Sequence, residues 1–95
     1  MKNITLSIHS NEYVWLRQLF IQKRNQLGLS QRALAERLGV IYSFIGKVET
    51  GDRKLDIFEF IHYCEALELD ANEVITQLLS LRNKIHLLHL RTVPL

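Results

Sequence analysis

The 95-residue sequence predicts an all-α domain of five helices, and three features of the chain support this. Apolar residues recur at spacings of three and four along most of it, which is the period of a helix that buries one face. Glycines stand where these segments end, and Ser or Asp residues stand where the next ones begin. With 47% hydrophobic residues and one proline, the composition is that of a folded chain with a single modest core.

The first helix is expected over residues 11–27, where apolar residues fall at helical spacing: Leu16, Leu19, Phe20 and Leu27. Gly28 follows at the position after the helix end, which favours a left-handed backbone. Ser30 is the expected N-cap of a second helix, which extends to about Leu38 and is closed by Gly39. The residues of this helix that face inward are Leu34, Ala35 and Leu38.

A third helix is expected over residues 41–50, with Gly51 ending it and with three residues facing the core: Ile41, Ile45 and Val48. Residues 28–51 therefore have the pattern of two short helices folded across a Gly-centred turn. This is a helix-turn-helix, at about residues 30–50, and such a unit usually binds DNA.

Two capping boxes predict the remaining helices. Asp56 with Glu59 begins a fourth helix over residues 56–67, and Asp70 with Glu73 begins a fifth. The fifth carries apolar residues at spacings of 4, 3, 4 and 3, which requires a continuous helix to about Leu90: Val74, Leu78, Leu81, Ile85 and Leu88.

The stripe on the fifth helix is longer than one small domain can cover. Its first half packs on the core of its own chain. The second half, Ile85–Leu90, has little domain left to cover. Pairing with the same helix of a second copy through Leu81, Ile85 and Leu88 is predicted, because exposed apolar stripes usually have a partner. Binding of a different protein by this C-terminal segment is the alternative.

Residues 3–9 alternate apolar and polar side chains, which is the period of a strand. A lone strand needs a partner from the C-terminal residues or from a second chain, and a disordered tail is the alternative. We therefore divide the sequence into an N-terminal strand or tail (1–10), a DNA-binding domain (11–75) and a dimerisation or partner-binding segment (76–95).

The net charge of +2 hides an asymmetry. Residues 1–54 carry nine Lys and Arg against four Asp and Glu, whereas residues 55–95 carry three against six. The first half is the expected polyanion-facing half, although ordinary solubility charge would give the same count. The single cysteine, Cys64, fits a reducing compartment, and the sequence shows neither a signal peptide nor an apolar stretch near the ~20 residues of a membrane-spanning helix. A cytoplasmic, nucleoid-associated protein is expected.

The third helix presents a polar patch opposite its inward face: Tyr42, Ser43, Gly46 and Lys47. A helix in the major groove reads base edges. Lys47 can donate to guanine, Ser43 can donate or accept, and Tyr42 can donate or pack on a thymine methyl group. Phe44 is equally a thymine contact or a core residue. The missing side chain at Gly46 allows close approach to the bases or to a neighbouring helix.

Phosphate contacts are expected on either side of this helix. The backbone amides at Gln31 and Arg32, in the first turn of the second helix, are unpaired within it and can hold a phosphate. The Gln31 side chain can also brace a residue of the third helix. Arg53 and Lys54 follow the third helix as natural contacts to the DNA backbone, with a solvated loop as the alternative.

The sequence resembles the lambda repressor/Cro-type (XRE-like) helix-turn-helix family of transcriptional regulators over about residues 16–75. The matching positions up to the end of the third helix are Arg24, Gly28, Leu29, Ser30, Gln31, Leu34, Ala35, Leu38, Gly39, Val40, Ile45, Val48, Glu49 and Gly51. The resemblance implies a five-helix, lambda-repressor-like DNA-binding domain that binds an operator as a dimer. It implies that four side chains reach DNA: Gln31, Tyr42, Ser43 and Lys47.

The resemblance also implies a partly buried ion pair between Arg24 and Glu49. A phosphate contact is the other role open to Arg24, but an unpaired Glu49 beside phosphates would be costly, which favours the pair. Two residues depart from the family pattern. Ile41 replaces the usual Ser or Thr cap of the third helix, and Gly46 replaces a small polar residue.

The function expected is a dimeric, sequence-specific regulator of transcription, most simply a repressor that occludes a promoter. The alternative is an antitoxin-like or bridging module that binds DNA together with a protein partner. An enzyme is not expected, because His86 and His89 do not complete a zinc site and no catalytic arrangement of Cys, His or Ser can be defended. No cofactor is expected.

Overall fold

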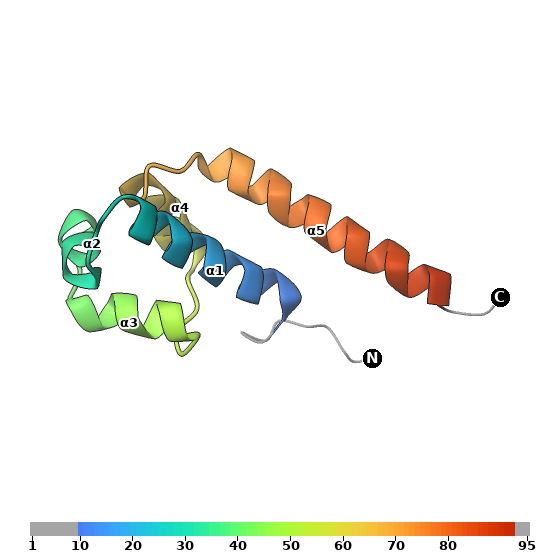
Figure 1. Cartoon of the computed structure of the whole chain (residues 1–95), viewed down its shortest axis with the longest axis horizontal. Helices are drawn as coiled ribbons and strands as arrows, with labels where there is room; N and C mark the ends of the chain where they lie inside the picture. Colours follow the sequence, from blue (N-terminus) through green and yellow to red (C-terminus); the bar gives the residue numbers. More distant parts are fainter. Residues whose placement is uncertain (1–9, 93–95) are drawn as a thin grey trace.

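Five helices follow one another in the computed structural model, which describes residues 10–92 and the side chains of residues 10–84 (Figure 1). They are α1 (Asn11–Gln26), α2 (Gln31–Leu38), α3 (Tyr42–Thr50), α4 (Ile57–Ala66) and α5 (Ala71–Thr92). No strand occurs among residues 10–92, which confirms the all-α class. The strand predicted near the N-terminus falls on residues outside the described ones.

The ends of the helices follow the capping residues of the sequence. Ser30 Oγ accepts the amide of Ala33 at 3.0 Å and begins α2. Both bonds of the predicted capping box are present at α4, because Asp56 accepts the amide of Glu59 at 2.8 Å and Glu59 accepts the amide of Asp56 at 2.9 Å. At α5, Asp70 accepts the amides of Asn72 and Glu73 at 2.8 and 3.4 Å. The local sequence therefore sets where these helices begin.

The prediction that Ile41 faces the core is wrong. Its backbone is extended (φ −71°, ψ 150°), so Ile41 is the N-cap of α3. The helical period does not apply to a residue that precedes the helix. The side chain is 75% exposed and makes no capping hydrogen bond. Helix α3 accordingly begins at Tyr42, without a side-chain cap.

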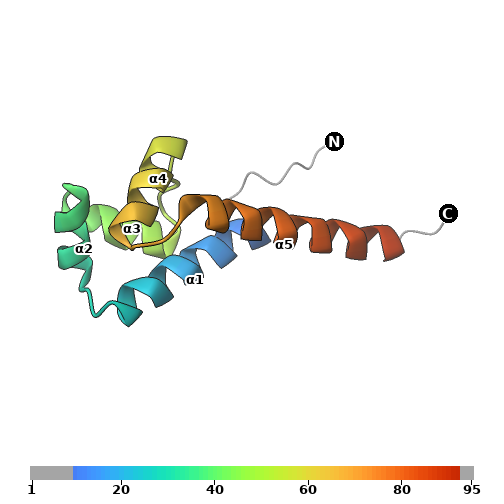
Figure 2. The same ribbon diagram turned by 90° about the horizontal axis from the view of Figure 1, so that it is seen from above.

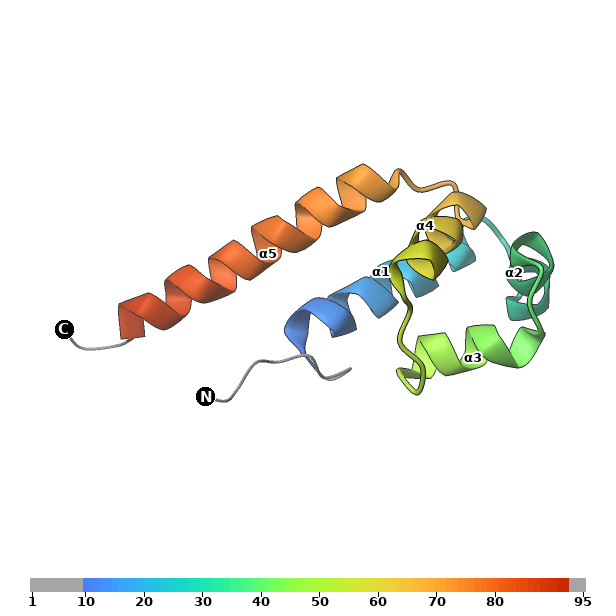
Figure 3. The ribbon, with the colours of Figure 1, turned by 180° about the vertical axis from the view of Figure 1, so that it is seen from behind.

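The core forms where α1 meets α4. Viewed from behind, α4 crosses α1 (Figure 3), and the rings of Phe20 and Tyr63 stack with their centroids 4.6 Å apart. Leu34, Ile45 and Leu67 are fully buried around them. These residues come from α1, α2, α3 and the end of α4, so a single core joins the helix-turn-helix to the rest of the domain.

Cys64 lies in the same core and is fully buried. Burial in apolar surroundings raises the pKa of its thiol to about 11. The thiol is therefore protonated at neutral pH and packs as a small apolar group.

Helices α1 and α5 lie side by side and run in opposite directions (Figures 1 and 2). Only the first half of α5 has α1 and α4 beside it, and the helix then extends beyond the start of α1 (Figure 2). The prediction of a continuous fifth helix to about Leu90 is confirmed, since α5 ends at Thr92. This extension makes the molecule long, with principal extents of 53 × 24 × 21 Å.

The hydroxyl of Tyr63 is a buried polar group without a hydrogen-bond partner among the described residues. Burial raises the pKa of this hydroxyl. We expect Tyr63→Phe to leave the free energy of unfolding unchanged or to raise it by about 1 kcal/mol, because no bond is lost and a desolvated hydroxyl is removed. Chemical denaturation measures this.

The matched control is Tyr13→Phe. Its hydroxyl accepts the amide of Leu55 at 2.7 Å, so this variant should lose about 1 kcal/mol. Equal losses in the two variants would show that the Tyr63 hydroxyl has a partner.

Candidate nucleic-acid interface

The turn between α2 and α3 fixes the relative direction of the two helices. Gly39 has a left-handed backbone (φ +71°), and the next amide, of Val40, donates to the carbonyl of Ala35 at 3.0 Å. A side chain at Gly39 would be strained by this backbone rather than by any neighbour, since nothing lies within 4 Å of the position that a Cβ would take there. The tight turn brings the start of α2 next to the outer face of α3.

Helix α3 has a buried face and an open face. Ile45 and Val48 are inside, with at most 1% of each exposed. The opposite face borders an open hollow of about 380 Å³, and its lining residues are Gln31, Tyr42, Ser43, Gly46, Lys47, Thr50 and Asp52. The structure thus brings together the third-helix patch and Gln31.

Gly46 lines this hollow together with Gln31 and Lys47. A Cβ added at Gly46 would meet only Gln31 Oε1, at 3.8 Å, which is ordinary van der Waals contact. Close packing against a neighbouring helix therefore does not explain the glycine. The other explanation offered by the sequence, close approach of α3 to bases, stays a prediction.

An ion pair joins α1 to α3. Arg24 Nε lies 2.6 Å from Glu49 Oε2, and Arg24 Nη2 lies 3.0 Å from Oε1. Arg24 Nη1 also donates to the carbonyl of Leu29 at 2.8 Å. The two side chains are 13% and 8% exposed, and the hydrogen bonds to Glu49 raise the pKa of Arg24. The guanidinium is thus fully engaged within the protein.

The same carboxylate positions Gln31. Gln31 Nε2 donates to Glu49 Oε1 at 2.9 Å, so α1, α2 and α3 share one network of hydrogen bonds. The amide oxygen of Gln31 is the atom nearest to the empty side-chain position of Gly46. Gln31 therefore offers a hydrogen-bond acceptor to whatever enters the hollow.

At the other end of the hollow, Arg32 packs on Tyr42. The guanidinium carbon is 4.2 Å from the ring centroid, which is a cation–π contact between α2 and α3. Both residues are exposed. The contact holds the Tyr42 ring at the start of α3 and places a positive charge beside it.

The Arg53 side chain is bound by other residues of the same chain. It forms two hydrogen bonds to the Glu59 carboxylate, at 2.9 and 2.8 Å, and its guanidinium carbon lies 4.5 Å from the Phe44 ring centroid. The hydrogen bonds from Arg53 lower the pKa of Glu59 most, and the hydrogen bond from the backbone amide of Asp56 lowers it further. Phe44 is half-buried and packs against the core. This arrangement favours the core role for Phe44, whereas the neighbouring Lys54 stays exposed.

Two features of the site were missed from sequence. Gly51 has φ +88°, and a Cβ there would come within 2.9 Å of the Arg17 guanidinium, so Arg17 packs directly on the end of α3. Arg17 precedes Arg24 by two helical turns, and that spacing places both on the side of α1 that faces α3. Thr50, which bonds Asp52 at 2.9 Å, extends the open face of α3 by three residues beyond Lys47. The same spacing argument would have found it.

Among the described residues no group of three or more His, Cys, Asp and Glu side chains is placed to hold a metal ion. The helices described here include none that is long and apolar enough to cross a membrane.

A protein-family model described as "Helix-turn-helix" matches residues 20–74. Among solved structures, the chain is similar to an "XRE-family like protein from Pseudomonas syringae pv. tomato str. DC3000". The two are 34% identical, and their superposition has a TM-score of 0.72 and covers 78% of this chain and 90% of the other. No curated protein matches the chain. The matched range includes α2, α3 and α4 entirely.

We expect Glu49→Ala to destabilise the fold by about 3–5 kcal/mol, because it leaves the buried Arg24 guanidinium without its main partner and also frees Gln31. Thermal and chemical denaturation measure the loss. Glu68→Ala is the matched control, since Glu68 pairs with Arg37 at 3.0 Å but is 58% exposed, and should cost less than about 1 kcal/mol. An unchanged melting temperature for Glu49→Ala would contradict the structural role of the pair.

Proposed function

The chain belongs to the XRE-like helix-turn-helix family of transcriptional regulators, and from this premise we propose that it is a sequence-specific regulator that inserts α3 into the major groove of double-stranded DNA. The family membership makes it a DNA-binding regulator. The open face of α3, with its glycine in the middle of a polar hollow, is the observation that supports the mode of binding.

The residues around the hollow have separate parts in this proposal. Lys47 and Ser43 read base edges, because both are exposed on the open face and carry hydrogen-bonding groups at their ends. Tyr42, held by Arg32, contacts the DNA at the start of α3. Gln31 reads a base donor through the oxygen that it presents to the hollow.

The phosphate contacts come from the edges of the same face. The first-turn amides of α2, at Gln31 and Arg32, hold one phosphate at the positive end of the helix dipole. Lys54 and Arg53 meet the DNA backbone beyond α3, with Arg53 fixed in place by Glu59. The Phe44 ring packs against the Arg53 guanidinium rather than reaching a base.

We further propose that the regulator acts as a homodimeric repressor that occludes a promoter, in the cytoplasm and on the nucleoid, without catalytic activity or a cofactor. The extension of α5 supports dimerisation, since the helix continues beyond α1 along the stripe that contains Leu81. The side chains of Ile85 and Leu88 lie outside the described ones. The division of the chain at residues 75 and 76 falls within α5, so one helix would connect the DNA-binding domain to the dimerisation segment.

Selection of binding sites from a random DNA pool at about 150 mM salt tests the function directly. We expect two inverted half-sites about one helical turn apart, because a twofold-symmetric pair presents two copies of α3 to successive major grooves. Binding to the selected site should weaken steeply as salt increases, since phosphate contacts release counterions. A pool without an enriched motif would overturn the proposal.

Gly46→Ala separates stability from DNA binding. Alanine fits beside Gln31 and raises helix propensity, so the variant should be more stable by up to about 1 kcal/mol. Affinity for the selected site should nevertheless fall by roughly tenfold, because the added methyl group moves α3 away from the bases. Ser80→Ala, on the exposed part of α5, is the control that should change stability slightly and affinity not at all. Full DNA affinity in Gly46→Ala would contradict close seating of α3.

A further inference from the structure

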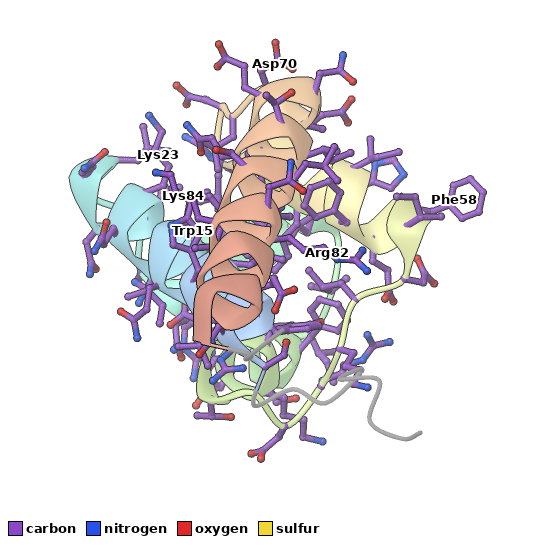
Figure 4. All side chains as sticks on the ribbon, turned by 90° about the vertical axis from the view of Figure 1, so that its right-hand side faces the viewer. Trp15, Lys23, Phe58, Asp70, Arg82 and Lys84 are labelled. Carbon is purple, nitrogen blue, oxygen red and sulfur yellow. The ribbon has the colours of Figure 1, made fainter. Side chains whose placement is uncertain are left out.

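A second surface of the molecule is apolar and has no role in the DNA-binding proposal. It comprises five exposed side chains of α4 and α5, called here the lateral patch: Ile57, Phe58, Ile61, Ile75 and Leu79. Phe58 is 71% exposed and stands out sideways from the start of α4 (Figure 4). Large apolar side chains gathered in this way usually mark an interaction surface.

A groove adjoins the lateral patch and shares Ile57 and Ile75 with it. It has a volume of about 270 Å³ and lies between α1, α4 and α5. Ile57 and Ile75 form its rim, the buried Leu16 and Phe60 form its floor, and Leu78 closes one side. Phe58, whose ring is largely exposed, follows the rim residue Ile57 directly on α4.

We propose that the lateral patch is the surface through which two copies of this chain pair, with Phe58 of each copy inserted into the groove of the other. This proposal rests on the dimeric part of the function proposed above. In a twofold-symmetric contact, one patch must supply both the projecting group and the cavity that receives it. The lateral patch and the adjoining groove supply both, whereas a partner of different shape would need only one of them.

The size of the patch agrees with this partner. From their exposed fractions, its five side chains present roughly 500 Å² of apolar surface, taking about 200 Å² for a large side chain when fully exposed. A stable interface covers about 800 Å² of each partner, and about 60% of it is apolar. The lateral patch therefore provides the apolar share that each half of such a dimer requires.

The groove is also continuous with the stripe that the sequence predicts to dimerise. Leu78 lines the groove, and Leu81 follows it by one turn on the same side of α5. Pairing through the patch would place the extended ends of α5 next to each other. The contact is then centred on α4, with Phe58 as the anchor, and continues along α5.

Sedimentation equilibrium of the full chain without DNA tests the proposal. The unaltered protein should form a dimer, and Phe58→Glu should weaken dimerisation by roughly 100-fold, as expected for the loss of a central aromatic anchor. Ile41→Glu is the matched control, because Ile41 is 75% exposed at the start of α3 and should leave dimerisation unchanged. Circular dichroism checks that both variants are folded.

Cross-linking gives the geometry. A mixture of Phe58→Cys and Ile75→Cys chains should form a disulfide-linked dimer, whereas the native Cys64 is buried and does not compete. An unaltered chain that is monomeric at about 1 mM, a Phe58→Glu chain that dimerises as tightly as the unaltered one, or the absence of the mixed disulfide would each overturn the proposal.

These results are independent of DNA binding. A monomer that still enriches a half-site from the DNA pool would overturn the lateral patch and leave the regulator intact. A dimer blocked by Phe58→Glu that enriches no DNA motif would support the patch and overturn the proposed function.

Discussion

The ion pair between Arg24 and Glu49 is the contact on which the position of α3 depends. Arg24 is near the end of α1 and Glu49 near the end of α3, so the pair joins segments that are 25 residues apart. The same carboxylate accepts a hydrogen bond from Gln31, the first residue of α2, and so ties the start of α2 to α3. A charged network, shielded from solvent, therefore determines which side chains of α3 remain outside. The buried surface of α3 is small and is formed mainly by Ile45 and Val48, so these directional hydrogen bonds add a constraint to the apolar packing and to the turn at Gly39.

Most of the fold could be predicted because its signals are local. The caps at Ser30 and Asp56, and the apolar period of α5, each lie within a few residues of the feature that they determine. The error at Ile41 has a local cause too. Ile41 continues the apolar period of α3 in the sequence, but it is the N-cap and its backbone is not helical. Its side chain therefore points away from the core.

The candidate site was less predictable, because its partners come from different elements. Nothing near Arg53 in the sequence indicates whether it faces DNA or the Glu59 carboxylate, and the same is true of the Phe44 ring beneath it. Arg17 and Thr50 were overlooked although helical spacing already placed them beside residues of interest. The hollow itself depends on the angle between α2 and α3, which the sequence implies only through resemblance.

The hydrogen bonds between Arg53 and Glu59 have a consequence for the whole assembly. They join the loop after α3 to the first turn of α4, next to Phe58. If two copies pair through Phe58, this link connects the paired surface to the α3 helix of each copy. One base pair added between two half-sites rotates one of them by about 34° around the DNA axis. A rigid dimer cannot follow that rotation, so its affinity would depend on the spacing of the two half-sites as strongly as on their base sequence.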